Sequence, residues 1–173
     1  IIARRSTDSG RTWNAPKRLH AFPWNETEGE WSASDASVIV DRETKTGFCF
    51  CNVWEWTKGK GFYRHFVQSS SDSGQTWSSP TEITAAIRRP QWTRSSFVFI
   101  TSGKGVQLKD GTLLHTMVWV DEKRACLFGS TDHGKTWGPV GSSVYPADEC
   151  KVMEREDGSW VVNARCATRT GGR

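Results

Sequence analysis

Glu149 and Arg165 are the two residues of this sequence that are best placed to act together on a substrate. They lie eight residues either side of Asp157, which begins the turn dipeptide Asp157-Gly158. Such a turn between two apolar runs predicts a β-hairpin with Glu149 and Arg165 at one end of its paired strands. The simplest interpretation is a cross-strand ion pair worth ~0.2–1 kcal/mol. The functional interpretation is a site, because a guanidinium binds a carboxylate through two parallel N–H bonds and a carboxylate can take a proton from a neighbouring group.

The elements that must hold such a pair are indicated by an eight-residue stretch that occurs three times. The copies are STDSGRTW at 6–13, SSDSGQTW at 70–77 and STDHGKTW at 130–137. The same position returns after 64 and then after 60 residues, and five positions are identical in all three copies. The sequence therefore contains an internal repeat with one such stretch in each unit.

The residue types of the repeated stretch predict a tight turn that stabilises the fold. Asp8, Asp72 and Asp132 can each accept hydrogen bonds from the backbone N–H groups that follow. The Gly two residues later suits a positive φ, and the final Trp can fill a gap between layers. The alternative, that these carboxylates bind metal or act as acids, is disfavoured because their spacing does not fit a calcium loop. We expect the three Trp side chains to be largely buried: Trp13, Trp77 and Trp137.

Short runs of apolar and β-branched residues, separated by turn signals, predict an all-β chain. Apolar residues occupy both odd and even positions along these runs, which indicates sheets that are covered on both faces. Two long segments without a period, 22–34 and 85–101, are expected to be loops. The predicted strands are 1–5, 17–20, 35–41, 47–54, 62–69, 79–83, a hairpin over 105–117, 124–129, 140–144, 149–154 and 160–164. They group into two whole four-stranded antiparallel sheets, with the end of one sheet before them and the first half of another after them.

Composition argues against several classes of function. The chain has 173 residues and a formal net charge of +4, without a basic run that approaches a nucleic-acid arm. No segment reaches the apolar length of a membrane span. The four scattered histidines form no metal-binding pattern, so neither a metal nor another cofactor is expected. The five cysteines form no CxxC pair and are expected to be buried free thiols: Cys49, Cys51, Cys126, Cys150 and Cys166.

The repeated stretch resembles the Asp-box, or BNR repeat, and a second segment resembles one found in sialidases (neuraminidases). That segment, DECKVMEREDGSWVVNAR at 148–165, has a Glu before an apolar strand, an Asp-Gly turn and an Asn-x-Arg. The resemblance implies an all-β chain, in which residues 1–173 are part of a six-bladed β-propeller of four-stranded antiparallel sheets. It also implies a sialylated glycan as the partner, without nucleic acid and without a membrane segment.

The resemblance also implies roles for three residues. In sialidases the Glu is paired with a nucleophilic Tyr and serves as its base, and the Arg is one of three that bind the carboxylate of sialic acid. By position these roles fall on Glu149 and Arg165. A Tyr nucleophile suits an anionic substrate, because a carboxylate nucleophile would repel it. Asp35, which follows Ser34 and precedes an apolar run, resembles the Asp that contacts the sugar hydroxyls; a residue that caps a strand is the competing interpretation.

The rest of the sialidase site has no counterpart in these 173 residues. The family's first carboxylate-binding Arg and its acid/base Asp stand upstream of the first Asp-box, and its third Arg and its Tyr stand in later blades. We therefore expect an internal fragment of a retaining exo-α-sialidase, inactive by itself. Two other interpretations stay open: a non-catalytic Asp-box propeller that binds glycans or peptides, and an Asp-box glycosidase for neutral sugars. The pairing of Glu149 with Arg165 favours the sialidase, because a neutral sugar needs no Arg clamp.

Aromatic and basic side chains in the longer connections could line a sugar site. We expect Asp35 to open onto the same cavity as Glu149. We also expect at least one of four further residues to lie on the rim that carries Glu149: Trp54, Trp56, Trp92 and Arg94.

Overall fold

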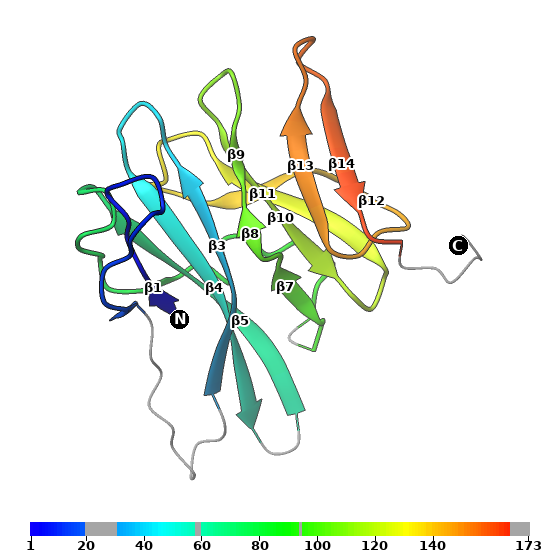
Figure 1. Cartoon of the computed structure of the whole chain (residues 1–173). Helices are drawn as coiled ribbons and strands as arrows, with labels where there is room; N and C mark the ends of the chain where they lie inside the picture. Colours follow the sequence, from blue (N-terminus) through cyan, green and yellow to red (C-terminus); the bar gives the residue numbers. More distant parts are fainter. Residues whose placement is uncertain (20–30, 58–59, 94, 167–173) are drawn as a thin grey trace.

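The computed structural model describes residues 1–19, 31–57, 60–93 and 95–166, and within these ranges it contains strands and turns but no helix. Figure 1 shows the strands in chain order. Their bounds are β1 Ile2–Ala3, β2 Lys17–Arg18, β3 Trp31–Val40, β4 Gly47–Thr57, β5 Lys60–Ser70, β6 Thr81–Glu82, β7 Val98–Ile100, β8 Gly103–Lys104, β9 Val106–Gln107, β10 Leu113–Trp119, β11 Arg124–Ser130, β12 Gly138–Val144, β13 Cys150–Glu154 and β14 Trp160–Ala164.

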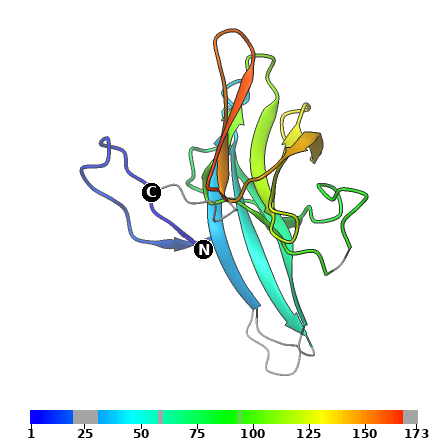
Figure 2. The same cartoon turned by 90° about the vertical axis from the view of Figure 1, so that its right-hand side faces the viewer.

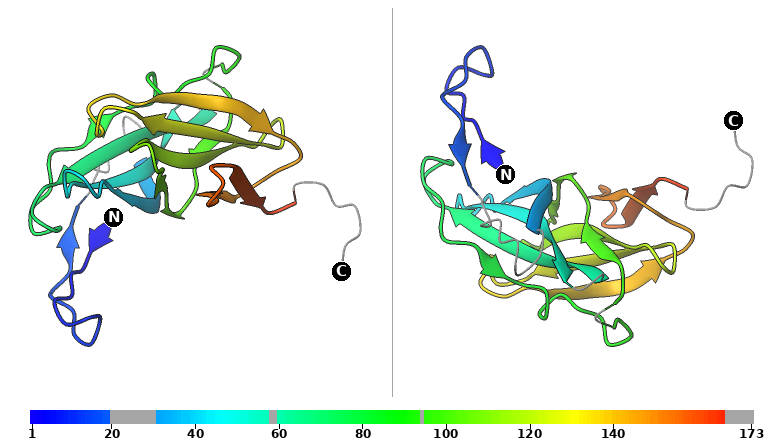
Figure 3. Two further views of the ribbon diagram at one scale, coloured as in Figure 1. Left: turned by 90° about the horizontal axis from the view of Figure 1, so that it is seen from above. Right: turned by 90° about the horizontal axis from the view of Figure 1, so that it is seen from below.

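The described strands form four sheets, which we number blades 1 to 4 in chain order. Blade 1 is β1-β2, blade 2 is β6-β5-β4-β3-β8, blade 3 is β12-β11-β10-β7 with β9 also paired to β10, and blade 4 is β13-β14. Pairing is antiparallel except that β8 runs parallel to β3. Blades 2 and 3 lie side by side, blade 4 lies beside blade 3, and blade 1 extends from the opposite end as an arm (Figures 2 and 3). These are successive blades of a β-propeller, in the order predicted from the sequence. Blades 2 and 3 each contain five strands, one more than predicted, because β8 adds to β3 and both β7 and β9 pair with β10.

The core lies between blades 2 and 3, because β4 and β10 carry apolar residues on both faces and both are largely buried. The ring of Phe50 in β4 lies 5.5 Å from the ring of Phe128 and 5.0 Å from that of Trp137 in blade 3. Full burial of an apolar side chain of this size contributes about 1.5–3 kcal/mol. Gly134 lets Phe48 of β4 approach the third repeated stretch closely, since a Cβ at this position would lie 2.2 Å from Cζ of Phe48.

Each Asp-box forms the turn that leads into the last strand of its blade. In blade 3, Asp132 accepts hydrogen bonds from the backbone N–H of Thr136 at 2.9 Å, from its hydroxyl at 2.6 Å and from the hydroxyl of Ser130 at 2.7 Å. The same three bonds recur at Asp8 and Asp72. These bonds, above all the one from the Thr hydroxyl, lower the pKa of Asp8 and of Asp72 to about 2. The three boxes are therefore equivalent turns, as predicted.

The Trp that ends a box packs on the blade that precedes it in the chain, where the structure describes such a blade. Trp137 is 8% exposed, and its ring lies 5.4 Å from that of Phe48 in blade 2. Trp77 is half-buried and lines a cavity of about 800 Å³ between blade 2 and the small blade 1. Trp13 is 57% exposed, because no described strand precedes blade 1 to cover it. The prediction that all three side chains are largely buried is therefore wrong for Trp13.

Two predicted loops contain strand. Strand β3 begins at Trp31, so the last four residues of the predicted loop over 22–34 belong to a strand. Residues 20–30 lie outside the described part of the chain. The predicted loop over 85–101 contains β7, which pairs with β10. Both strands are held by partners distant in sequence, which local patterns do not show. Four cysteines are buried, as expected: Cys49, Cys51, Cys126 and Cys150. Cys166 is exposed, so the expectation of burial is wrong for this residue.

Candidate functional site

The hairpin β13-β14 holds Glu149 and Arg165 opposite each other. Its register pairs Cys150 with Ala164, and the backbone N–H of Arg165 donates to the carbonyl of Glu149 at 2.8 Å. Nη1 of Arg165 lies 3.1 Å from Oε2 of Glu149, with the two side chains 63% and 52% exposed. An ion pair this exposed is screened by water and contributes at most about 1 kcal/mol to folding. The ion pair therefore contributes little to the stability of the fold.

Asp148 is a second carboxylate that binds Arg165, and it was not among the site residues predicted from the sequence. Nη2 and Nε of Arg165 donate to Oδ2 of Asp148 at 2.5 and 3.1 Å. This hydrogen bond and the charge of Asp148 raise the pKa of Arg165 above its ordinary value. Asp148 thus engages two of the five guanidinium N–H groups and leaves three for Glu149 and a further acceptor. The sequence does show two adjacent acidic residues at the start of a predicted strand, and this pattern could have indicated a second partner for Arg165.

Asp35 lies inside β3, not at the start of a strand as the sequence suggested. The register of β3 against β4 shifts between Ser34 and Ser37, so Asp35 stands in a β-bulge with φ 53°. A bulge turns a side chain away from the regular alternation of the strand. The carboxylate accepts hydrogen bonds from Ser34 Oγ at 2.7 Å, Asn52 Nδ2 at 2.9 Å and Ser102 Oγ at 3.1 Å. These bonds fix both oxygens of a partly buried carboxylate.

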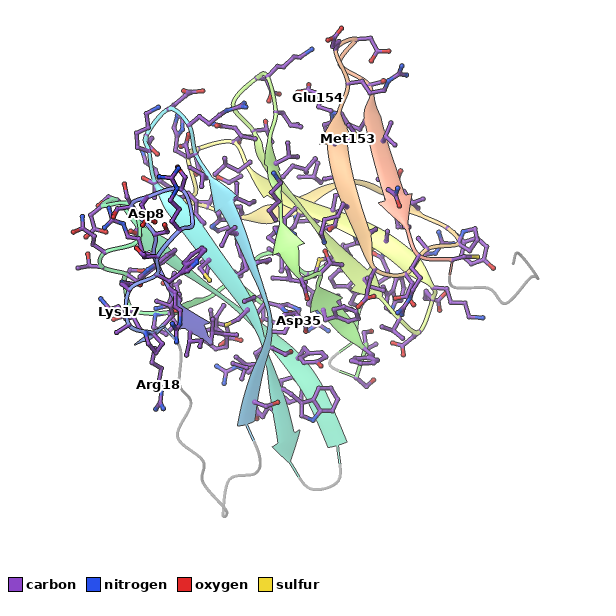
Figure 4. All side chains as sticks on the ribbon, viewed as in Figure 1. Asp8, Lys17, Arg18, Asp35, Met153 and Glu154 are labelled. Carbon is purple, nitrogen blue, oxygen red and sulfur yellow. The ribbon has the colours of Figure 1, made fainter. Side chains whose placement is uncertain are left out.

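The three candidate residues lie away from the ends of the sheets that carry the Asp-boxes. Strands β3 and β13 run in the same direction in Figure 1, and Glu149 directly precedes β13. In Figure 4, Asp35 lies on β3 on the side toward β7, far from Asp8 in the first box. We call the edge formed by the beginning of β3, the end of β4, the beginning of β5 and the Glu149 end of the hairpin the site rim.

The further aromatic residues divide between this rim and the core. Trp54 pairs with Ser32 at the beginning of β3, on the site rim, and its ring lies 4.8 Å from that of Tyr63. Trp92 is 6% exposed and packs in the core, 6.0 Å from the ring of Trp119. The side chain of Trp56 and all of Arg94 lie outside the described part of the chain.

Three cavities are well defined in the described part of the chain, and none of them is the shared cavity expected for Asp35 and Glu149. Their volumes are about 440, 800 and 330 Å³, and neither Asp35, Glu149 nor Arg165 lines any of them. The largest lies between blades 1 and 2, and the second lies along β5 beside Trp92. A cavity shared by Asp35 and Glu149 therefore stays a prediction.

Lys151 adds a cation beside the candidate residues, and the sequence analysis did not single it out. Its Nζ donates to Oγ1 of Thr101 and to the carbonyl of Cys150, each at 3.0 Å. Partial burial lowers its pKa from the ordinary value. Its side chain passes close to Gly103, where a Cβ would lie 3.1 Å from Cε of Lys151. The ammonium is thus held two residues from Glu149.

The described residues supply no cluster for a metal ion. No group of three or more His, Cys, Asp or Glu side chains within them is arranged to bind one. The same residues contain no helix that is long and apolar enough to cross a membrane. What the site offers chemically is a proton acceptor, a guanidinium and a fixed carboxylate.

Comparison with known proteins agrees with the blades and the boxes. Residues 1–171 match the family model described as BNR repeat-like domain. The chain belongs to this family. The sialidase of Micromonospora viridifaciens is 35% identical over 192 residues, which cover 100% of this chain and 29% of that protein. The sialidase of Bacteroides fragilis (strain YCH46) is 31% identical over 185 residues, which cover 93% of this chain and 32% of that protein.

Solved structures lead to the same relatives. The Hadza microbial sialidase Hz136 has a TM-score of 0.78 and 28% identity, over 94% of this chain and 35% of that chain. The resemblance to sialidases found in the sequence is thus confirmed. This chain of the BNR repeat-like family spans about one third of the length of the curated relatives, which are matched over 29% and 32%.

Proposed function

We propose that this chain is part of an exo-α-sialidase that hydrolyses terminal sialic acids of glycoconjugates with retention of configuration. Glu149 is its base, and Arg165 and Asp35 bind the substrate. The observation that carries the proposal is the Glu149–Arg165 pair, held at 3.1 Å on the rigid hairpin of blade 4. It is supported by 31–35% identity to two sialidases over at least 93% of the chain.

Each residue type suits its proposed task. A Tyr that stands outside these 173 residues is the nucleophile, and the carboxylate of Glu149 takes its proton as it attacks. Half of the Glu149 side chain is exposed, so a phenol can approach it. Arg165 keeps three N–H groups beyond those held by Asp148, and two parallel N–H bonds match the carboxylate of a sialic acid. Asp35 accepts hydrogen bonds from sugar hydroxyls.

A second candidate is a non-catalytic Asp-box propeller that binds glycans or peptides. The engagement of Arg165 by both Asp148 and Glu149 favours it, because a guanidinium that already binds two carboxylates of its own hairpin is less available to the carboxylate of a sialic acid. The two functions differ in whether Glu149 is needed for turnover, and this decides the experiment.

We expect Glu149→Gln in the full-length protein to lower kcat for a fluorogenic sialoside by about 10²–10⁴-fold, because it removes a base and keeps the shape. Substrate binding should change little. The matched control is Glu156→Gln, an exposed residue at the turn of the same hairpin, which should leave kcat unchanged. Near-normal turnover in Glu149→Gln would reduce the pair to an ion pair and favour the non-catalytic propeller.

We expect Arg165→Lys to raise KM about 10-fold or more, because one ammonium cannot hold a carboxylate through two parallel bonds. Arg155→Lys is the control, since Arg155 forms an exposed ion pair with Asp157 at the other end of the hairpin, at 3.6 Å. An unchanged KM in Arg165→Lys would contradict the proposed clamp. The 173-residue chain by itself should show no hydrolysis in the same assay, because the nucleophile and the acid are proposed to lie outside it.

A further inference from the structure

Asn52 is a fully buried polar residue next to the candidate site, and the proposed function gives it no role. It stands on β4, between Ser34 of β3 and His65 of β5, and is 0% exposed. Its Nδ2 donates to Oδ2 of Asp35 at 2.9 Å and to the carbonyl of Ile100 at 2.8 Å. Its Oδ1 accepts from the N–H of Ile100 at 2.8 Å and faces Nδ1 of His65 at 3.1 Å. A side-chain amide has two donors and two acceptor sites, so Asn52 is fully satisfied.

These partners fix the orientation of the amide. Turning it by 180° would set its oxygen against the carboxylate of Asp35 and the carbonyl of Ile100, neither of which donates. His65 fits the same orientation: it is 3% exposed, burial lowers its pKa to about 4, and a neutral ring with Nδ1–H donates to Oδ1 of Asn52. The N–H of Asn52 is therefore held toward Asp35 by three independent contacts.

Asp35 needs such support because its backbone lies in the left-handed region, at φ 53°. The oxygen held by Asn52 is Oδ2, which also accepts from Ser34 at 2.7 Å. Its other oxygen, Oδ1, accepts at 3.1 Å from Ser102, an exposed residue. The part-buried contacts therefore occupy Oδ2, whereas the contact of Oδ1 with Ser102 is exposed, so that a hydroxyl of a ligand can reach Oδ1.

Asn52 also connects Asp35 to the hairpin that carries Glu149. Ile100 ends β7, and the hydroxyl of the next residue, Thr101, donates to the carbonyl of Cys150 at 3.2 Å. The hydroxyl of Thr116 donates to the same carbonyl at 2.8 Å. Cys150 directly follows Glu149. A line of buried polar contacts thus runs from β4 of blade 2 through β7 of blade 3 to the first residue of blade 4.

We propose that Asn52 is a positioning residue that aims the Oδ1 oxygen of Asp35 at the substrate and keeps Asp35 in register with the Glu149–Arg165 pair. This inference rests on the proposed function, because it assumes that Asp35 contacts the sugar. It adds that the contact depends on a buried residue that never touches the substrate. The consequence is measurable as substrate affinity, since loss of a contact that is equally strong in the ground state and the transition state raises KM and leaves kcat unchanged.

The test is steady-state hydrolysis of a fluorogenic sialoside by variants of the full-length protein. Asn52→Asp keeps the shape and the acceptors toward Ile100 and His65 but removes both donors. We expect it to raise KM at least 10-fold with kcat within 3-fold of the original. Ser102→Ala, at the surface, should raise KM by about 2–5-fold without unfolding the protein. Ser37→Ala is the control, because the hydroxyl of this buried neighbour has no hydrogen-bond partner among the described residues; it should change neither constant.

A double-mutant cycle separates positioning from general loosening of the fold. In an Asp35→Ala background, Asn52→Asp should no longer raise KM, because the residue through which it acts is gone. An equal rise in both backgrounds, or a KM within 2-fold of the original in Asn52→Asp, overturns the inference. If Asn52→Asp does not fold, Asn52→Ser, which is uncharged and lacks the amide donors, takes its place in the same cycle with the same expected result.

The same set of variants also distinguishes failure of this inference from failure of the proposed function. Loss of turnover in Glu149→Gln together with an unchanged KM in Asn52→Asp leaves the sialidase and removes the role of Asn52. Normal turnover in Glu149→Gln removes the sialidase mechanism itself. An unchanged KM in Asp35→Ala shows that Asp35 does not contact the substrate, and the inference then falls with it.

Discussion

Asp41 shows how single residues join neighbouring blades. It follows β3 in blade 2, its side chain is 0% exposed, and Nδ1 of His133 from the third Asp-box approaches its Oδ2 at 2.8 Å. Its Oδ1 accepts from Nε2 of Gln107, also in blade 3, at 2.9 Å, and Thr44 donates to Oδ2 at 2.8 Å. Burial alone would raise the pKa of Asp41, but these hydrogen bonds outweigh it and hold the pKa well below the ordinary value. The buried carboxylate is thus a polar link between two blades.

Replacing His133 tests this link without disturbing the box. The other two boxes have Ser at the equivalent position, with φ of 58° and 59° against 60° for His133, so His133→Ser keeps a residue type that this turn accepts. We expect the free energy of unfolding to fall by about 1–3 kcal/mol, because a hydrogen bond to a buried charge is lost. Urea unfolding measures it. Lys135→Ser, exposed in the same turn, is the control and should stay within about 0.5 kcal/mol; equal effects would contradict the link.

At the scale of elements, the Asp-boxes could be predicted because all of their hydrogen bonds are local. Asp132 and its partners lie within six residues of one another, so the residue types alone specify the turn. Strand β7 could not be predicted, because it is three residues long and pairs with β10, some twenty residues further along the chain. The bulge at Asp35 is invisible for the same reason: Asn52 and Ser102 hold it from other parts of the sequence.

The three boxes also permit a comparison of one motif in three surroundings. Trp137 is 8% exposed, Trp77 is half-buried and Trp13 is 57% exposed. We expect Trp137→Ala to cost about 3–5 kcal/mol, because a large ring leaves the core between blades 2 and 3. Trp13→Ala should cost about 0.5 kcal/mol or less, and Trp77→Ala an intermediate amount.

Guanidinium unfolding of the three Trp variants checks this order. If the cost came from the turn itself, all three substitutions would be equally destabilising, because the bonds within the boxes are the same. Equal costs would therefore show that the Trp supports its own turn and not the contact between blades.

At the scale of the molecule, the hairpin symmetry around Asp157 was enough to predict that Glu149 meets Arg165. Two further parts of the site were not predicted, one within the same hairpin and one between blades. Asp148 becomes a partner of Arg165 only once the hairpin closes, at 2.5 Å, and Asn52 meets Ile100 only when blade 3 lies on blade 2. A sequence pattern shows periodicity within one element and carries no information about which carbonyl will lie opposite a given amide.

Packing of the blades also buries two histidines, His65 in blade 2 and His115 in blade 3, which are 3% and 0% exposed. Burial disfavours the charged ring and lowers the pKa of each to about 4 from an ordinary value of 6.5. Between these two pH values the unfolded chain binds protons that the folded chain does not. Folding stability must therefore fall as the pH is lowered from 6.5 to 4, by up to about 3 kcal/mol for each histidine.

Folding stability falls in a second pH range, which is lower and in which the carboxylates of the boxes titrate. The pKa of Asp8 and of Asp72 is lowered to about 2 from 3.8, so their contribution is complete above 3.8 and is lost as the pH falls toward 2. Urea midpoints between pH 7.5 and 2.5 should thus decline in two steps. His115→Phe, which keeps a ring beside Phe128, should weaken only the upper step. A midpoint that stays constant from pH 6.5 to 4 would mean that both histidines are protonated in the folded chain, and that water reaches the interface between the blades.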